Sequence, residues 1–242
     1  MTTPVPAPSS APAACGRAVA IAVAAAAVLA GCGGGGAGDA VRDPIPSTPQ
    51  APPAPPLLAR PLVPAGLGLH AGPTPVPLEL RLPSLQVSGA MLAVGITAGS
   101  VMDAPQGPLG DPVWQQAFWY RGGGIPGDVG TATIAGHVDD VRGRPALFAH
   151  LSDLHSGDPV VVHDTRSGTD VRFAVDRVAT YSIQQASQPA ILASIYGAGP
   201  VAGTGPQPAP DGLAHLTLVT CAGGFVHGGY DHRVVVYAQR IA

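Results

Sequence analysis

Residues 215–221, His-Leu-Thr-Leu-Val-Thr-Cys, form a short run of leucine, valine and threonine that ends on a cysteine. β-Branched and large apolar residues in a run of this length are typical of a strand that packs against a core. The domain around it, between residue 77 and the C-terminus, follows a period of two rather than the 3.6 of a helix. The run therefore predicts an all-β domain in which Cys221 stands at the end of a strand.

Five other segments show a strand pattern. They are Leu78–Leu82, Thr131–Ala135, Pro159–His163, Thr169–Val178 and Val234–Ala238. The turn residues Ser167-Gly168 make the segment that follows them the return arm of a hairpin that begins at Val160. We expect few helical stretches beyond Val113–Phe118 and Ala146–Leu151. Several short strands with turns between them predict a closed or nearly closed β-barrel with short helices, and closure would also remove exposed strand edges.

The first 31 residues have the features of an export segment. Arg17 precedes residues 18–30, an apolar run of 13 residues that suits a signal-peptide core and falls short of the ~20 needed to span a bilayer. The quartet Leu29-Ala30-Gly31-Cys32 then resembles a bacterial lipobox, which implies cleavage before Cys32 and acylation of that cysteine. An ordinary signal peptide and an uncleaved anchor helix are the alternatives.

Composition divides the rest of the chain. Residues 32–76 are rich in glycine, proline and alanine with few large apolar side chains, so we expect a flexible, disordered spacer. Residues 77–242 are then one folded domain with a core of its own. The whole chain has 12 basic residues, all arginine, against 15 acidic ones, and its net charge is −3. This balance, without any basic stripe, argues against nucleic-acid binding.

Cys221 is the one cysteine that the folded domain contains, because Cys15 and Cys32 belong to the N-terminal export and lipidation signals. An exported domain with a single unpaired thiol is unusual, since oxidising compartments favour paired cysteines. The pattern favours a reactive nucleophile. A small buried hydrophobe in a barrel wall is the structural alternative.

Two further residues are candidates to act with Cys221. Arg233 begins the strand that follows it, so an antiparallel pair would bring both side chains to one end of the barrel. His137 ends a third strand. An imidazole can hold the sulfur as a thiolate and later protonate a leaving amine, and a guanidinium can stabilise the oxyanion of a tetrahedral intermediate. The three residues together predict an acyl-transfer site.

Each candidate also has a simpler interpretation. His137 could cap a turn, and Arg233 could be a solvated strand end. Arg177 and Arg240 are comparable cations by residue type. A metal site is a further alternative, although no CxxC or HExxH spacing supports it. Its ligands would come from the cluster Cys221, His227, Tyr230, Asp231 and His232.

Three motifs in a fixed order resemble those of the sortase family. The strand Leu216–Cys221 resembles the TLxTC signature, Asp231–Ala238 resembles the arginine strand, and Thr133–His137 resembles the stretch leading to the family's histidine. The similarity extends over residues 78–242, and the chain most resembles the actinobacterial class F branch. The supporting matches are Leu80–Val87, which resembles the opening strand, Trp119–Gly127, Leu147-Phe148 and Gly157–Val160.

The resemblance implies a role for four residues. Cys221 would be the nucleophile, His137 the general acid and base, and Arg233 the cation that holds the substrate carbonyl and the oxyanion. Thr220 would support the oxyanion or position the substrate. No cofactor and no metal are implied. Gly197–Gly212, which precedes the nucleophile strand where sortases recognise their substrate, carries no familiar recognition pattern.

The function implied is that of a cysteine transpeptidase tethered to the outer face of the bacterial cell membrane. It would cleave exported proteins at an LPxTG-like sorting signal and pass the acyl group from a thioester to an amine. A peptidoglycan precursor or a protein lysine would supply that amine, and water would give hydrolysis. An L,D-transpeptidase is an alternative, but its SHGC-type motif is absent. A membrane-tethered, non-catalytic binding module on a degenerate barrel is the other.

Overall fold

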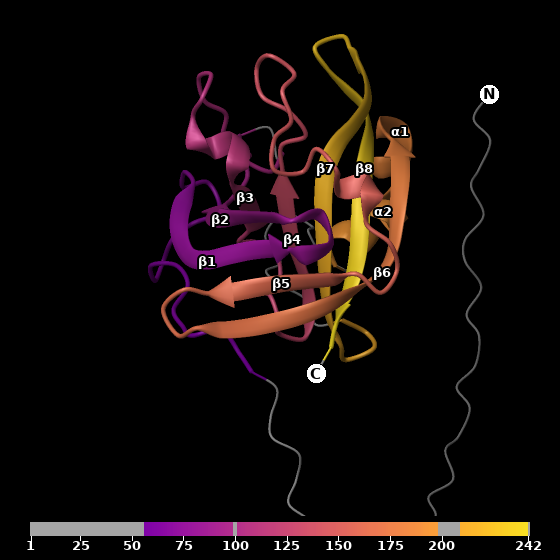
Figure 1. Ribbon diagram of the computed structural model, residues 1–242. Coiled ribbons are helices and arrows are strands. Elements are labelled where there is room, and N and C mark those ends of the chain that lie inside the picture. The colour runs from indigo at the N-terminus through magenta and orange to yellow at the C-terminus, as the bar shows by residue number, and fades with distance from the viewer. Residues whose placement is uncertain (1–55, 99–100, 198–208, 242) are drawn as a thin grey trace, which may run out of the picture. The chain divides into compact units, whose positions relative to one another are not determined.

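The structure, a computed structural model, describes residues 56–98, 101–197 and 209–241. Within these residues eight strands close into a barrel in the order β1-β2-β3-β4-β7-β8-β6-β5 (Figure 1). The all-β barrel predicted from the strand pattern is therefore confirmed. The strands are β1 (Thr74–Leu82), β2 (Val87–Val94), β3 (Ala117–Tyr120), β4 (Gly130–Gly136), β5 (Pro159–Asp164), β6 (Thr169–Ser182), β7 (Ala214–Val226) and β8 (Gly229–Arg240).

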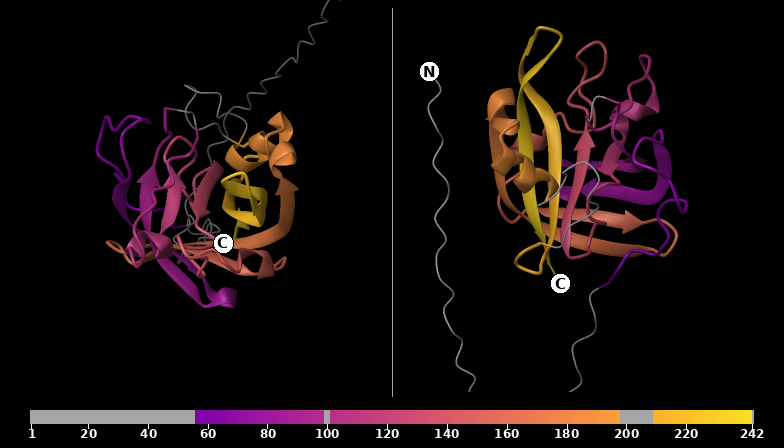
Figure 2. Two further views of the ribbon diagram at one scale, coloured as in Figure 1. Left: turned by 90° about the horizontal axis from the view of Figure 1, so that it is seen from above. Right: turned by 180° about the vertical axis from the view of Figure 1, so that it is seen from behind.

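The helices of the described residues are short. The connection from β6 to β7 contains α1 (Ile183–Ala186) and α2 (Pro189–Tyr196), which lie outside the barrel, α1 beside β6 and β8 and α2 beside β4 (Figure 2). The Ser182 hydroxyl accepts from the Gln185 N–H, and the Gln185 side chain reaches back to the Ser182 N–H, a capping box that starts α1. Three 3₁₀ helices complete the set: Pro83–Leu85, Pro112–Gln115 and Leu151–Asp153.

Two of the eight strand pairs are parallel. These are β2 with β3 and β4 with β7, and the other six pairs are antiparallel. Parallel neighbours end at the same edge of a sheet, whereas a hairpin joins opposite ends of its two strands. The C-terminal halves of β4 and β7 and the N-terminal half of β8 therefore meet at one end of the barrel.

Alternating side chains fill the inside of the barrel. In β1 the inward positions are Leu78, Leu80 and Leu82, all at most 1% exposed. Phe173 from β6 and Phe148 from the connection between β4 and β5 are buried in the same cluster. Burying one such side chain stabilises the fold by about 1.5–3 kcal/mol, so this core fixes the strands that carry the candidate site.

Residues before the predicted domain boundary at residue 77 are already part of the folded domain. Leu58 and Leu62, in the segment predicted as a flexible spacer, are buried in the main core at 5% and 7% exposure. The Ala59 N–H donates to the buried carboxylate of Asp164 at 3.0 Å. The last residues of the predicted spacer are thus part of the domain.

Three local predictions are wrong. Val113–Phe118 was expected as a helix, but only its start is helical, in a 3₁₀ turn, and Ala117 and Phe118 belong to β3. Ala146–Leu151 is mostly a turn, and only its last residue is helical, as the start of the 3₁₀ helix Leu151–Asp153. The expected opening strand Leu80–Val87 is interrupted by the 3₁₀ helix between β1 and β2. All four residues of β3 are buried, so the alternation that marks a strand is missing there.

The predicted export segment, residues 1–31, and the predicted lipidation site at Cys32 lie outside the described residues. Among the residues that the structure does describe, no helix has both the length and the apolar character needed to cross a membrane.

Candidate active site

Strand register brings the three candidate residues to one row at one end of the barrel. β7 and β8 pair Cys221 directly with Arg233. β4 and β7 run parallel with Ala135 opposite Val219, so His137 and Cys221 are each two residues further along. Neighbouring strands lie about 5 Å apart. The candidate base and the candidate cation therefore flank the cysteine, one on each side.

Cys221 is a free, half-buried thiol. Burial raises the pKa of this thiol, the positive charge of Arg233 acts to lower it, and the carboxylate of Asp139 raises it again. Because the net pKa lies above the ordinary value, the sulfur carries its proton at neutral pH. A base must therefore accept this proton for the sulfur to act as a nucleophile.

His137 is held by the connection between β2 and β3. Its Nε2 lies 2.8 Å from the carbonyl oxygen of Pro105. A carbonyl only accepts, so Nε2 carries a proton, and Nδ1 is the nitrogen that can take up or release one. The rings of Trp114 and Phe118 pack against the imidazole with centroids 4.8 and 5.2 Å away. These contacts fix the ring and leave one nitrogen available for proton transfer.

Arg233 is anchored by its own hairpin. Its Nη1 donates to the carbonyl oxygens of His232 at 2.7 Å and Tyr230 at 3.1 Å. Backbone acceptors hold the side chain without neutralising it, since neither oxygen carries a net charge. The guanidinium thus keeps its positive charge beside the thiol.

The other two arginines considered as cations are engaged elsewhere. Arg240 lies near the opposite end of β8, where its guanidinium donates to the carbonyls of Gly127 and Pro56. Arg177 lies over the ring of Tyr237, with Cζ 3.6 Å from the ring centroid, and donates to the hydroxyl of Tyr181. Of the three, only Arg233 is paired with Cys221.

Thr220 lies next to Cys221 in β7 and is hydrogen-bonded to β4. The side chain is buried, and alternation along β7 directs it to the face opposite Cys221. Its hydroxyl donates to the carbonyl of Gly136 at 2.9 Å. The hydroxyl thus joins β7 to the last residue of β4, immediately before His137, and is not directed toward an oxyanion at the thiol.

Asp139 and Tyr230 lie beside the thiol, although the sequence pattern did not assign either residue to an acyl-transfer site. The Tyr230 hydroxyl donates to the Asp139 carboxylate, which joins the connection after β4 to the hairpin of β7 and β8. Asp139 is two residues after His137. This proximity to the candidate base was the one feature of the sequence that could have indicated a place for Asp139 near the site. Nothing local to Tyr230 indicates a partner 91 residues away.

The metal alternative gains no support. Within the described ranges, no group of three or more histidine, cysteine, aspartate or glutamate side chains is arranged to hold a metal ion. His227 is at the tip of the hairpin with φ of 50°, and His232 is bonded through Nδ1 to Asp231 at 2.7 Å.

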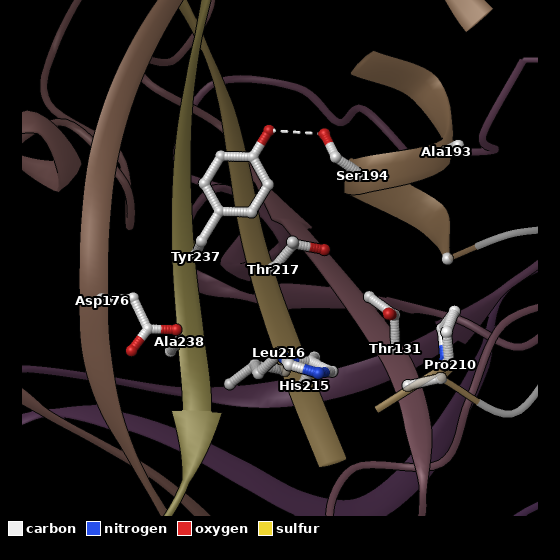
Figure 3. Close-up of a pocket in the computed structure, with 12 residues that line it drawn as sticks. Thr131, Asp176, Ala193, Ser194, Pro210, His215, Leu216, Thr217, Tyr237 and Ala238 are labelled. Carbon is white, nitrogen blue, oxygen red and sulfur yellow. Dashed lines mark hydrogen bonds between the residues drawn. The ribbon is translucent and has the colours of Figure 1, made fainter. Parts of the chain in front are cut away.

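A cavity of about 310 Å³ lies further along the same outer face of the barrel (Figure 3). Its lining includes Thr217 of β7 and Tyr237 of β8. Thr217 is four residues before Cys221 in β7, and Tyr237 is four residues after Arg233 in β8. Four strand residues span about 13 Å. The cavity is therefore separate from Cys221 but continues the face on which the thiol lies.

Helix α2 is fixed over this face by polar contacts. The Ile195 carbonyl accepts from the hydroxyls of Thr133 and Thr217 at 2.9 and 2.5 Å. The hydroxyls of Ser194 and Tyr237 are hydrogen-bonded at 2.9 Å, as Figure 3 shows. Gly197, Ala209 and Pro210, from the two described ends of the segment expected to recognise substrate, also line the cavity.

Solved sortase structures are among the proteins similar to this chain. Sortase A from Corynebacterium diphtheriae is 20% identical with a TM-score of 0.47, and the match covers 70% of this chain but only 62% of that protein. Sortase C-1 from Actinomyces oris is 18% identical with a TM-score of 0.46, and the match covers 68% of this chain and 71% of that one. A sortase D5 transpeptidase from Clostridium perfringens is 16% identical with a TM-score of 0.44, covering 68% and 78%.

No curated protein matches the chain significantly. The model of the sortase domain, by contrast, matches residues 80–241, about two thirds of the whole sequence. That match includes Cys221, His137 and Arg233 and all of the barrel except residues 74–79 of β1. The chain therefore belongs to the sortase family.

Proposed function

We propose that this protein is a cysteine transpeptidase that cleaves exported proteins at an LPxTG-like sorting signal. In this proposal Cys221 is the nucleophile, His137 the general acid and base, and Arg233 the oxyanion-stabilising cation. The observation that carries the proposal is the row formed at one end of the barrel, with Cys221 opposite Arg233 and His137 at the matching end of β4. The class F-like branch stays a prediction from the sequence.

The first half of the reaction forms a thioester. The Cys221 thiol gives its proton to Nδ1 of His137, and the sulfur attacks the carbonyl carbon of the scissile peptide bond. The negative charge that develops on the carbonyl oxygen is stabilised by Arg233, a contribution of about 10²–10³-fold for a single oxyanion donor. When the intermediate collapses, the C–N bond breaks and the proton passes from His137 to the leaving amine.

The second half transfers the acyl group. An amine attacks the thioester carbonyl and gives a proton to His137, the C–S bond breaks, and the thiol regains its proton. The product is a new amide, and the enzyme returns to its starting state. Water in place of the amine gives the free acid. We propose a peptidoglycan precursor or a protein lysine as the acceptor.

We propose that the substrate lies extended along the outer face of β4, β7 and β8. An extended chain advances about 3.4 Å per residue, so a peptide with its scissile bond at Cys221 reaches the cavity beside Thr217 about four residues away. The position of the cavity between α2 and the ends of the predicted recognition segment supports this placement. Thr220 then acts by holding β4 and β7 together rather than by touching substrate.

A peptide library incubated with hydroxylamine tests the proposal. Hydroxylamine intercepts a thioester as a hydroxamate, so mass spectrometry identifies both the cleavage motif and the covalent chemistry. The fragment should begin near residue 52, because Leu58 and Leu62 are part of the core. We expect hydroxamate products from the wild type and none from Cys221→Ala. A folded wild type without products, or activity retained in Cys221→Ala, would favour a binding module or another nucleophile.

We also propose that the protein is a lipoprotein tethered to the outer face of the cell membrane through Cys32. The lipobox-like quartet and the apolar run before it support this part of the proposal. Intact mass spectrometry of the membrane-extracted protein should find a chain that starts at an acylated Cys32, and Cys32→Ser should abolish that species. A chain that keeps residues upstream of Cys32 and is unaffected by Cys32→Ser would contradict it.

A further inference from the structure

Asp139 and Tyr230 form a contact between the two segments that flank the thiol. Asp139 follows His137 by two residues in the connection from β4 to β5, and Tyr230 precedes Arg233 by three residues in β8. The phenol hydroxyl donates to the carboxylate, and both residues are partly buried. One hydrogen bond therefore connects the segment that carries the candidate base with the strand that carries the candidate cation.

Tyr230 is connected to Arg233 through its backbone as well. Its carbonyl oxygen accepts from Nη1 of Arg233 at 3.1 Å. The phenol ring is fixed on its other side by an edge-on contact with Phe225, whose ring centroid is 5.3 Å away. These two residues are also paired across the hairpin beyond an irregularity that follows Ala222. Tyr230 is thus held from three directions.

The charges around Cys221 give this contact an electrostatic consequence. Arg233 and Tyr230 lie near the thiol on β8. His137 and Asp139 lie near it at the end of β4 and in the connection after β4. The charge of Arg233 also acts on Tyr196 of α2. Asp139 raises the pKa of the Cys221 thiol and therefore opposes the effect of Arg233. The hydrogen bond to Asp139, with burial, raises the pKa of Tyr230 to about 12, so this phenol stays protonated and remains a donor throughout the neutral range.

We propose that the Asp139–Tyr230 hydrogen bond is a bridge that holds His137 and Arg233 in place on either side of Cys221, and that the bridged carboxylate tunes the reactivity of the thiol. Asp139 and Tyr230 are positioning residues in this scheme. The inference rests on the proposed function, because it takes Cys221 as the nucleophile. The Tyr230 hydroxyl donates to the Asp139 carboxylate and partly offsets its negative charge. Asp139 therefore disfavours the Cys221 thiolate less than a carboxylate without this donor would.

The rate of Cys221 alkylation by iodoacetamide, measured against pH on the full chain, tests the bridge without any substrate. Asp139→Asn removes the carboxylate, so we expect the midpoint of the profile to move to lower pH and the rate at pH 7 to rise roughly two- to tenfold. Tyr230→Phe leaves the carboxylate without its donor and should move the midpoint to higher pH. In the Asp139→Asn background, Tyr230→Phe should have no further effect.

Tyr181→Phe is the matched control, since it removes a phenol hydroxyl that is hydrogen-bonded away from the thiol. Its profile should equal that of the wild type. The bridge would be overturned if the midpoint of the alkylation profile stayed unchanged in both Asp139→Asn and Tyr230→Phe. It would also be overturned if Tyr230→Phe shifted the midpoint equally in the wild type and in Asp139→Asn. If Tyr230→Phe does not fold, the midpoint of Asp139→Asn alone decides. Peptide cleavage retained in Cys221→Ala would instead overturn the proposed function, and the alkylation profiles remain interpretable in that case.

Discussion

At the scale of single residues, the site combines a nucleophile recognisable in the sequence with partners that are not. Cys221 and Arg233, which the sequence pattern places at strand ends, lie inside β7 and β8, and His137 directly follows β4. The register places the three in one row. The Pro105 carbonyl binds His137 from the connection between β2 and β3, and Tyr230 of β8 binds Asp139 of the connection after β4. These pairs are 32 and 91 residues apart in the chain, separations that no local pattern encodes. The row could be predicted because strand pattern and family motif coincide there; the loop contacts could not, because they depend on tertiary packing.

Arg233→Ala should reduce turnover by ~10²–10³-fold if the guanidinium stabilises the oxyanion. Arg233→Lys should restore only part of this loss, because an ammonium is a point charge whereas a guanidinium offers a planar pair of donors. Steady-state kinetics with the peptide found in the library screen would measure both variants. Arg240→Ala is the comparison, since its guanidinium binds carbonyls elsewhere. If Arg240→Ala lost activity and Arg233→Ala did not, the assignment would be wrong.

The pH dependence of thiol alkylation should report the charge of Arg233 directly. Burial already raises the pKa of Cys221, and the nearby guanidinium lowers it. Removing that charge in Arg233→Ala should raise the thiol pKa further, so the thiolate forms only at higher pH and alkylation at neutral pH slows. A profile that does not move, or moves to lower pH, would show that Arg233 lies too far from the sulfur to act on it.

At the scale of elements, the strands rich in β-branched or alternating apolar residues were predictable, whereas β2 and β3 were not. β1 alternates between buried and partly exposed residues along its second half and was found, whereas β3 is buried throughout and resembles a helix turn in the sequence. β2 was missed because it contains small residues, among them Gly89. A Cβ at Gly89 would come within 2.7 Å of the Gln115 carbonyl oxygen. Close packing therefore requires glycine at this position, and the glycine weakens the strand pattern in the sequence.

The position of α2 should depend on the hydrogen bond between Tyr237 and Ser194. Tyr237→Phe and Ser194→Ala should each cost about 1 kcal/mol of stability, increase amide exchange in α2 and raise KM for peptides long enough to reach the cavity. The two changes share one bond, so the double variant should lose less than the sum of the two single losses. Ser187→Ala, whose hydroxyl binds the Ile183 carbonyl in the neighbouring helix, is the matched control. Additive effects on exchange and KM would exclude this bond as the cause.

At the scale of the whole molecule, the barrel includes chain that composition alone assigned to a linker. Leu58 and Leu62 lie among glycines, prolines and alanines, so their burial was not predictable from the local sequence. Asp164 accepts hydrogen bonds from this segment and from its own turn. Burial opposes the ionisation of Asp164, but these bonds outweigh it and hold the pKa of the carboxyl below its ordinary value.

Leu58→Ala should destabilise the domain by about 2–3 kcal/mol, because it removes a buried side chain that packs on the core. Leu57→Ala is the matched control, since the neighbouring side chain is 56% exposed, and its effect should stay within about 0.5 kcal/mol. Urea unfolding of the two variants would measure the difference. Equal midpoints for Leu58→Ala and the wild type would show that this segment detaches without cost.

The parallel pairing of β4 with β7 has a consequence for the order of folding. Gly136 and Thr220, which join these strands beside the thiol, are 84 residues apart in the chain, whereas the hairpin that pairs Cys221 with Arg233 is local. Local pairs close early and distant ones late, because a long loop must first lose its entropy. A newly exported chain would thus acquire its thiol and guanidinium before its imidazole. On the proposed assignment, partly folded chains therefore have no catalytic activity until the barrel closes and His137 reaches the thiol.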